Sequence, residues 1–168
     1  VPSQLKKWWR EGSFTDLETM RAQMVELLIG GGPSPKQLLD EGLEEGWPLR
    51  LSYAMSEACS TIAMTPPGNP HAPYEVLSHW EWTTDNGCLA LKGPSLACGL
   101  LTESGFQPLT KRDGWWHTSD EIELEGSGFR WKSRRDRIII SGGEKISPER
   151  LEQWLYAHGA TKAWVLKI

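Results

Sequence analysis

Two short segments in the first half of the chain carry residue types that could bind a nucleotide and a metal ion. Gly30–Pro33 (Gly-Gly-Gly-Pro) follows an apolar run, and glycines at such a turn let backbone lie close to a flat ligand. Tyr53, Ser56 and Glu57 offer an aromatic face, a hydroxyl and a carboxylate, which suit a base, a phosphate oxygen and Mg²⁺. Simpler interpretations exist: the glycines would form an ordinary strand-to-helix connection, and Ser56 would cap a segment running through Ile62.

Two more candidates follow in the second half of the chain. The Asp120 carboxylate could accept both hydroxyls of a ribose, and the guanidinium fork of Arg134 could reach a ribose or a phosphate. A predicted hairpin of strands 121–124 and 129–132 places the two residues across from each other, so we expect them to approach one ribose site. Alternatively, Asp120 is a turn residue beside a charged hairpin. His117 is expected to pack or to face solvent.

A run of cations next to aromatic residues raises a different possibility. Five cations stand within eight residues, and a cluster of this kind beside Phe129 and Trp131 could bind a polyanion: they are Arg130, Lys132, Arg134, Arg135 and Arg137. Three neighbouring glutamates offset this charge, namely Glu121, Glu123 and Glu125. A solvated basic hairpin is therefore favoured, and the net charge of −4 argues against nucleic acid or anionic lipid as a partner.

Composition sets the broad class of protein. The chain has 168 residues, of which 39% are hydrophobic and 24% charged, so it is neither disordered nor membranous. No apolar run approaches the ~20 residues that a membrane span needs. Three cysteines without metal-type spacing indicate reduced thiols in a cytoplasmic protein. The sequence begins without Met and ends in an apparent strand, so we interpret it as a piece of a longer protein.

The hydrophobic pattern divides the chain into unlike parts. Residues 1–64 predict an α/β unit: a buried parallel strand at 25–29, a helix from Ser34-Pro35 to Gly46, and a strand at 49–53. A Pro-rich connection follows at 65–73. Residues up to 132 then alternate in polarity between Gly-containing turns, which predicts a small antiparallel β-barrel or sandwich.

The last part predicts the start of a small α+β domain. Residues 133–137 would be a charged hinge, and Ile138, Ile139 and Ile140 a short buried strand. Ser147 and Pro148 are an N-cap and a first helical residue, so a helix is predicted over 148–157, closed by Gly159. A strand is predicted over 161–168.

Taken in order, the four segments resemble the AMP-forming acyl-adenylating enzymes, a family of acyl-CoA synthetases, aryl-CoA ligases, luciferases and adenylation domains. Gly30–Pro33 is similar to the family's Gly-Gly-Ala-Pro, and 53–57 to Tyr-Gly-Met-Thr-Glu. Residues 114–120 are similar to Gly-Trp-x-x-Thr-Gly-Asp, and 133–136 to Gly-Arg-x-Asp. The departures are Gly32, Ala54, Ser56, Ser119 and Ser133. Residues 140–149 also resemble the family's segment after the hinge.

The resemblance implies a role for each matching residue. The adenine would lie against Gly31, Gly32, Pro33 and Tyr53. The α-phosphate would touch Ser56, Mg²⁺ would be held by Glu57, and this pair would be catalytic. Asp120 and Arg134 would bind the ribose or phosphate. The C-terminal domain, 138–168, would turn about Asp136, and Gly142 and Gly143 would then line the pantetheine path of CoA.

The implied activity is ATP-dependent activation of a carboxylic acid to an acyl-adenylate, followed by transfer to CoA. Within the family, residues 1–5 and 140–149 are most like the o-succinylbenzoate–CoA ligases of menaquinone or phylloquinone biosynthesis, so o-succinylbenzoate is the expected acid. The family's phosphate loop and C-terminal catalytic lysine have no counterpart in this sequence, and 1–168 alone is expected to be inactive. The alternatives are another acid or thiol acceptor, or a non-catalytic nucleotide-binding fragment.

Overall fold

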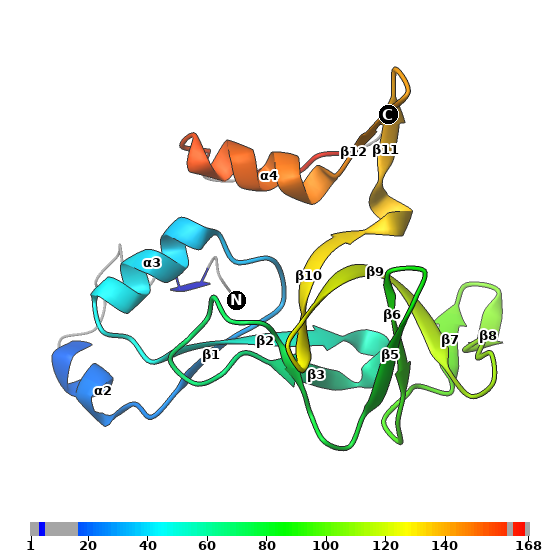
Figure 1. Cartoon of the computed structure of the whole chain (residues 1–168), viewed down its shortest axis with the longest axis horizontal. Helices are drawn as coiled ribbons and strands as arrows, with labels where there is room; N and C mark the ends of the chain where they lie inside the picture. The colour runs from blue at the N-terminus through cyan, green and yellow to red at the C-terminus, as the bar shows by residue number, and fades with distance from the viewer. Residues whose placement is uncertain (1–3, 6–16, 161–162, 167–168) are drawn as a thin grey trace.

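A computed structural model describes residues 4–5, 17–160 and 163–166 of the chain. Two four-stranded sheets form most of it, and a piece made of a hairpin and a helix follows them along the chain (Figure 1). The helices are α2 (Leu17–Gln23), α3 (Lys36–Glu44) and α4 (Pro148–Ala157). Within these described ranges, none of the helices has the length and apolar character that crossing a lipid bilayer requires.

The first sheet contains the predicted strand–turn–helix–strand unit. Its strands, in spatial order, are β1 (Leu27–Ile29), β2 (Leu49–Met55), β3 (Ser60–Met64) and β4 (Glu75–Val76). β1 and β2 are parallel, with α3 as the crossover between them, and the other pairs are antiparallel. Leu38 and Leu39 of α3 pack with Leu49 of β2 in one buried cluster. The strand predicted at 25–29 begins later, and Val25 is exposed.

The chain reverses direction just after β2. Ser56–Ala58 form a single 3₁₀ turn, η1, and Cys59 takes a left-handed φ of 65° that leads into β3. Ile62 lies in β3, so the interpretation in which Ser56 caps a segment through Ile62 is wrong. Ser56 and Glu57 therefore stand at the carboxyl end of β2, the end at which open α/β sheets bind their ligands.

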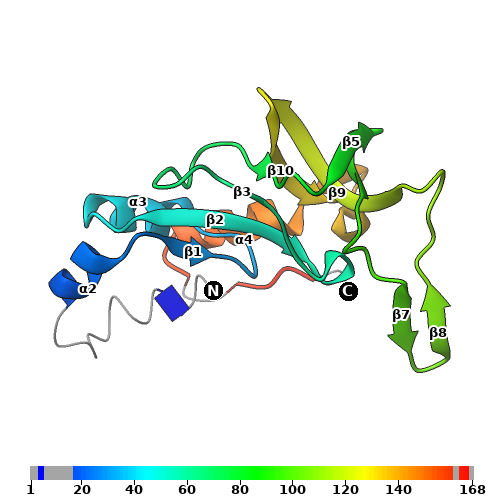
Figure 2. The same cartoon turned by 90° about the horizontal axis from the view of Figure 1, so that it is seen from below.

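The second sheet is antiparallel throughout, as the alternating pattern predicts. Its strands, in spatial order, are β10 (Gly128–Arg134), β9 (Trp116–Glu125), β6 (Cys88–Lys92) and β5 (Glu81–Asp85). Asn86 and Gly87 take φ values of 52° and 79°, which match the right-handed twist of a tight hairpin. A separate hairpin, β7 (Gly99–Thr102) with β8 (Gly105–Pro108), projects from the body (Figure 2).

The two sheets share one core. Tyr74 and Phe129 form an antiparallel bridge that joins the loop before β4 to β10, and their backbones exchange two hydrogen bonds. Buried Ile62 from the first sheet lies in the same cluster as Leu89 and Leu91 from the second. The strand order of the second sheet is open, and closure into a barrel stays a prediction. The domain limits at 64/65 and 132/133 likewise stay predictions.

Replacing Phe129 with alanine should destabilise the protein by about 3–5 kcal/mol, because a fully buried aromatic side chain leaves a cavity when it is truncated. Phe129 has no exposed surface, and its ring lies 5.3 Å from Tyr53, 5.7 Å from Tyr74 and 5.7 Å from Trp82, between centroids. Leu124→Ala, at a 60% exposed position of β9, is the control and should change stability by less than ~0.5 kcal/mol. Denaturant unfolding of the intact protein measures both, and equal losses would contradict the core assignment.

The C-terminal piece starts where β10 ends. A 3₁₀ turn, η2 (Arg135–Arg137), leads to the hairpin of β11 (Ile139–Ser141) and β12 (Glu144–Ile146), and then to α4. The helix has the predicted bounds, and the Ser147 hydroxyl accepts a hydrogen bond from the Arg150 backbone amide as its N-cap. Gly159 takes a positive φ of 94° after its end.

Two predictions for this piece are wrong. Ile140 is 66% exposed, because β11 pairs only with β12 and that two-stranded hairpin has no further layer over it among the described residues. The predicted strand at 161–168 is absent from described residues 163–166, and its other positions lie outside the described residues.

Candidate active site

Asp120 is the buried centre of the candidate site. It lies on β9 with 8% of its surface exposed, and each carboxylate oxygen accepts one hydrogen bond: from the Tyr53 hydroxyl at 2.6 Å and from the Trp131 indole N–H at 3.1 Å. A carboxylate can accept about four hydrogen bonds, so both oxygens keep capacity for a ligand hydroxyl. The contact with Tyr53 joins residues 67 positions apart and ties the first sheet to the second.

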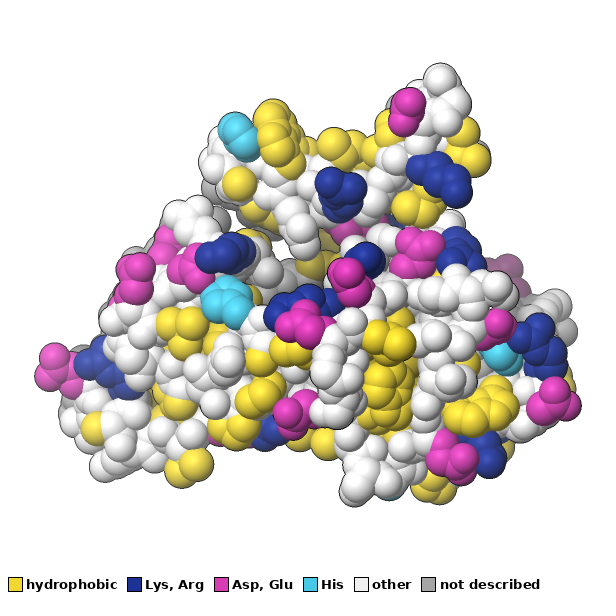
Figure 3. Space-filling view, viewed as in Figure 1, with side chains coloured by type: hydrophobic (Ala, Val, Ile, Leu, Met, Phe, Trp, Pro, Cys, Tyr) yellow, Lys and Arg dark blue, Asp and Glu magenta, His cyan; other side chains and the backbone are white. Residues whose placement is uncertain are grey.

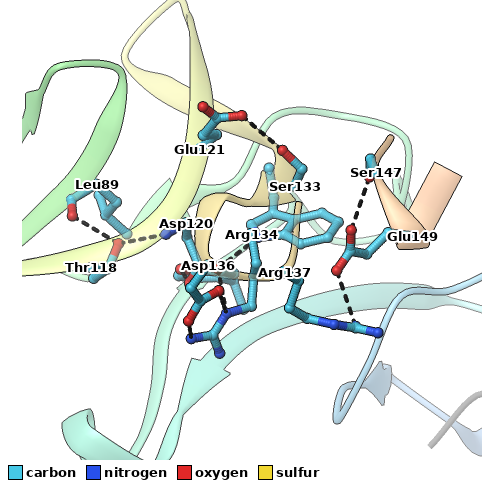
Figure 4. Close-up of polar contacts among 12 residues, drawn as sticks. Leu89, Thr118, Asp120, Glu121, Ser133, Arg134, Asp136, Arg137, Ser147 and Glu149 are labelled. Atoms are coloured by element: carbon cyan, nitrogen blue, oxygen red, sulfur yellow. Dashed lines mark hydrogen bonds and ion pairs between the residues drawn. The ribbon is translucent and has the colours of Figure 1, made fainter. Parts of the chain in front are cut away.

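Thr118 and Ser119 support this part of β9. The Thr118 hydroxyl donates to the Leu89 carbonyl oxygen at 2.8 Å and accepts from the Asp120 backbone amide at 3.1 Å (Figure 4). After the contact with Arg134, the Ser119 side chain also helps to lower the pKa of Asp136. Thr118, Ser119 and Trp131 were not predicted to support Asp120. The sequence could have indicated them only by position: Thr118 and Ser119 directly precede Asp120, and Trp131 lies in the strand that pairs with β9.

Tyr53 lies in the aromatic core, and this differs from the open strand-end ring that the sequence suggested. It is 9% exposed, and its ring packs edge-on against Phe129 and tilted against Tyr74. Burial, then the charge and the hydrogen bond of Asp120, raise the pKa of the Tyr53 phenol, so the hydroxyl stays protonated and donates. The stacking of Tyr53 on adenine stays a prediction.

Arg134 and Asp120 approach each other as predicted. They are register partners across β10 and β9, and the Arg134 Nε lies 3.9 Å from an Asp120 oxygen. The guanidinium makes its hydrogen bonds to Asp136, from Nε at 3.1 Å and from Nη2 at 2.7 Å (Figure 4). This bidentate contact lowers the pKa of Asp136 and raises that of Arg134. The proposed ribose-binding residue is thus held by the proposed hinge residue.

The Asp136 carboxyl should therefore titrate below its ordinary value of 3.8, and Arg134→Gln should return its pKa toward 3.8. Because the folded-state pKa is depressed, the stability that this pair adds is present above 3.8 and is lost as the pH falls through the folded pKa. Carbon-13 NMR of the carboxyl measures both values. Arg112→Gln, which removes a cation paired with Asp85, is the control and should leave Asp136 unchanged. A wild-type pKa at or above 3.8 would contradict this.

Glu57 belongs to the same neighbourhood. It sits in η1, partly buried, and its negative charge contributes to raising the pKa of Arg134. Its backbone carbonyl oxygen accepts a hydrogen bond from Ala97 at 2.7 Å, which fixes the turn. Ala54, at the position of a family glycine, lies in extended β2 and is not among the residues of positive φ, so alanine fits there. Ser56 is exposed beside Glu57.

The glycine loop after β1 leaves its backbone accessible. Gly31 and Gly32 have φ values of 83° and 155°, and a side chain built on Gly32 would meet no atom within 4 Å. A Cβ on Gly30 would lie 3.3 Å from the Ser52 hydroxyl, which places the loop against β2. Parallel strands β1 and β2 end at the same edge, as expected. That Gly31, Gly32 and Pro33 share a cleft with Tyr53, Ser56 and Glu57 stays a prediction.

Each cation of the predicted basic cluster has a carboxylate partner. Arg130 pairs with Glu125, Lys132 with Glu123 at 3.0 Å, and Arg135 with Glu121 at 3.1 Å. Arg137 pairs with buried Glu149 at 3.0 Å, and Arg134 pairs with Asp136. Space-filling representation shows cationic and anionic side chains mixed where the C-terminal piece stands over the second sheet (Figure 3). These pairs favour the charged hairpin over a polyanion-binding surface.

Gly142 and Gly143 form the turn of the β11–β12 hairpin, with φ values of 59° and 85°. The tip of this hairpin points away from the two sheets (Figure 1). The structure therefore does not bring these two glycines to Asp120 in this arrangement. Their assignment to a CoA path requires the C-terminal piece to turn, as the sequence analysis supposed.

Known proteins resemble this chain over most of its length. No protein-family model matches it. The 2-succinylbenzoate–CoA ligase of Bacillus subtilis (strain 168) is 31% identical over 170 residues, covering 86% of this chain and 35% of that protein. That of Bacillus licheniformis is 33% identical over 147 residues, covering 79% and 31%. The chain thus spans about a third of the length of the curated relatives it matches.

Solved structures match the fold. An arginine-to-lysine variant of Escherichia coli MenE with bound OSB-AMS gives a TM-score of 0.78 at 27% identity, covering 95% of this chain and 34% of that one. B. subtilis o-succinylbenzoate CoA synthetase (MenE) in complex with the acyl-adenylate intermediate OSB-AMP gives 0.75 at 30% identity, covering 99% and 37%. The same enzyme in complex with ATP and magnesium ion gives 0.65 at 28% identity, covering 92% and 38%. By sequence and by fold, the chain is a homologue of the 2-succinylbenzoate–CoA ligases and belongs among the AMP-forming acyl-adenylating enzymes.

Proposed function

We propose that this chain supplies part of the nucleotide site of an ATP-dependent acid–CoA ligase, and that the acid is o-succinylbenzoate. The observation that carries the proposal is the Asp120 cluster. This cluster consists of the buried Asp120 carboxylate, Arg134 on the facing strand and the partly buried Glu57. The surrounding fold matches that of an enzyme solved with bound OSB-AMP. A role in menaquinone biosynthesis and a cytoplasmic location are parts of the same proposal. The described cysteines are free thiols, as a cytoplasmic location requires.

The reaction would proceed in two steps. A carboxylate oxygen of the acid attacks the α-phosphorus of ATP, and the bond to pyrophosphate breaks, which gives an acyl-adenylate. The CoA thiolate then attacks the acyl carbon, and AMP leaves with the bonding electrons. In the first step Asp120 would accept the ribose hydroxyls, and Arg134 would bind ribose or phosphate. Gly31, Gly32, Pro33 and Tyr53 would enclose the adenine.

Ser56 and Glu57 would act at the phosphates. The Ser56 hydroxyl would donate to the α-phosphate, where negative charge gathers during attack. Mg²⁺ is commonly held by one or two carboxylates together with substrate phosphates, and partly buried Glu57 at the end of β2 suits that requirement. When bound, the ion would neutralise phosphate charge.

We assign each part of the chain to a subdomain of the proposed enzyme. Residues 1–64 would belong to the adenylate-binding subdomain and 65–132 to a subdomain that closes as a β-barrel. Residues 133–137 would be the hinge, and 138–168 the start of the C-terminal domain. A turn about Asp136 would bring Gly142 and Gly143 to the pantetheine of CoA for the second step.

Acid-dependent exchange of labelled pyrophosphate into ATP tests the first step in the intact protein. We expect pyrophosphate exchange with o-succinylbenzoate in the absence of CoA. When CoA is added, we expect a thioester and AMP. Exchange with no thioester would favour a different thiol acceptor. The absence of exchange with any aryl acid would favour a non-catalytic nucleotide-binding role.

Replacing Asp136 with proline should slow thioester formation at least tenfold and leave adenylation within about threefold, because proline fixes φ near −65° and would restrict the hinge. Asp136→Ala removes the same carboxylate but leaves φ free, so it controls for loss of the Arg134 contact. Single-turnover assays of each half-reaction measure the effect. Equal slowing of both half-reactions by proline would contradict the hinge assignment.

A further inference from the structure

A cleft of about 640 Å³ lies where the C-terminal piece meets the second sheet. Glu121, Lys132 and Arg135 line it from β9, β10 and η2. Lys145 of β12, Ser147 at the N-cap of α4 and Arg150 of α4 also line it. Glu121 and Lys132 precede the proposed hinge and Arg135 lies within it, whereas the second group follows it, so a ligand that fills the cleft would contact residues before and after the hinge.

The cleft carries an excess of positive charge on a chain whose net charge is −4. Among the described residues that line the cleft, Glu121 is the one carboxylate, and it is already engaged by the Ser133 hydroxyl at 2.8 Å and by Arg135 at 3.1 Å. Lys145 and Arg150 have no carboxylate within ion-pair distance among residues 4–5, 17–160 and 163–166. The hydrogen bond from Ser133, then the hydrogen bond and charge of Arg135, and lastly the charge of Lys145 lower the pKa of Glu121.

The residue types fit one ligand chemistry. Lysine and arginine together offer both a point charge and a planar fork of N–H donors, the pair of groups that proteins use for phosphate. Ser147 is the N-cap of α4, a ten-residue helix, and helix N-termini favour negative charge. Lys132 is paired with Glu123 and Arg135 with Glu121, so the charges of Lys145 and Arg150 remain to be compensated. A monocarboxylate or a neutral ligand would leave part of this remaining charge uncompensated, whereas a phosphoryl dianion would balance it.

We propose that this cleft binds a phosphoryl anion and that the bound anion holds the C-terminal piece in the orientation seen here. The anion would be attracted to cations on both sides of the hinge at once. Its affinity would therefore be higher for this orientation than for one in which Lys145 and Arg150 move away. A ligand with such a difference in affinity shifts a conformational equilibrium toward the state it prefers.

One consequence rests on the proposed function. Adenylation releases pyrophosphate, and the second step needs the hinge to turn. Pyrophosphate or inorganic phosphate in the cleft would then oppose the turn, so it would slow thioester formation more than adenylation. Pyrophosphate should bind more tightly than phosphate, because its two phosphoryl groups can reach both walls together.

Calorimetric titration of the intact protein with inorganic phosphate and with pyrophosphate, in the absence of ATP and acid, tests the binding claim. The double variant Lys145→Gln/Arg150→Gln should bind each anion about tenfold more weakly or worse, a loss of at least ~1.4 kcal/mol, because it removes two charge-assisted contacts with the anion. Lys111→Gln, which removes an exposed cation outside the cleft, is the matched control and should bind as the wild type does. Equal affinity in the wild type and the double variant, or no binding to the wild type, would overturn the proposal.

The hinge claim has its own measurement in the same proteins. Added phosphate should slow the thioester half-reaction of the wild type and of Lys111→Gln, with little effect on that of the double variant. If phosphate slows the double variant as much as the wild type, the cleft does not control the hinge. If the anions bind as expected but neither the wild type nor any variant has ligase activity, the proposed function is contradicted and the anion site is not.

Discussion

Replacing Asp120 with asparagine should lower the kcat/KM for ATP in adenylation about 100-fold, or ~2.7 kcal/mol, and leave the fold intact. The amide is the same size as the carboxylate. Its oxygen can still accept from the Trp131 N–H, and its NH₂ group can donate to the Tyr53 hydroxyl oxygen, so both contacts persist although the Tyr53 O–H no longer donates to residue 120. The main losses are the charge and the capacity to accept hydrogen bonds from both ribose hydroxyls.

Tyr53→Phe is the matched control for this prediction. It deletes the 2.6 Å hydrogen bond to Asp120 but keeps the carboxylate for the ligand, so its kcat/KM should fall less than tenfold. Unfolding midpoints of both variants separate binding from stability. If Asp120→Asn retains wild-type kcat/KM, or Tyr53→Phe loses as much as Asp120→Asn, the carboxylate does not bind the ribose.

Glu57→Gln should reduce adenylation about 100-fold at low magnesium and recover part of the loss as magnesium rises, because the amide is a neutral and weaker ligand for a hard cation. Glutamine keeps the length of the side chain, and the backbone carbonyl oxygen of residue 57 can still accept from Ala97. The magnesium concentration for half-maximal pyrophosphate exchange is the readout that distinguishes loss of a ligand from general damage.

Glu81→Gln is the control for the carboxylate change, since Glu81 is exposed on β5 and pairs only with Lys92 at 3.1 Å in the described structure. It should exchange pyrophosphate at the wild-type rate and with the wild-type magnesium dependence. If the magnesium dependence of Glu57→Gln matches that of the wild type, Glu57 is not a magnesium ligand, whatever the rate of the variant.

Local signals in the sequence predicted several elements closely. The predicted strands 121–124 and 129–132 lie within β9 and β10, and helix α4 has its predicted bounds, because turn residues with positive φ and a Ser-Pro helix start restrict the backbone within a few residues. The predicted burial of Ile140 was wrong, because burial does not depend on local sequence alone. A run of β-branched residues predicts a strand, but whether the strand is buried depends on which other element covers it.

The sequence predicted which residues form the candidate site, but it predicted few of the contacts between them. The proximity of Asp120 and Arg134 follows from one hairpin register, which alternating residues reveal. The hydrogen bond from Tyr53 to Asp120 links two sheets, and no local pattern encodes such a distant pair. The part played by Trp131 was missed because a tryptophan on a strand usually signals packing, whereas here its N–H also satisfies a buried carboxylate.

A crystal structure of the intact protein with a hydrolysis-resistant acyl-adenylate analogue would show whether the Asp120 cluster binds the nucleotide. We expect electron density for the ribose with its hydroxyls within ~3.2 Å of the Asp120 oxygens, and adenine between the Gly31-Gly32 backbone and Tyr53. The phosphate mimic should lie beside Ser56. An analogue bound with its ribose away from Asp120, in a protein that still forms the thioester, would contradict the assignment of this cluster as the nucleotide site.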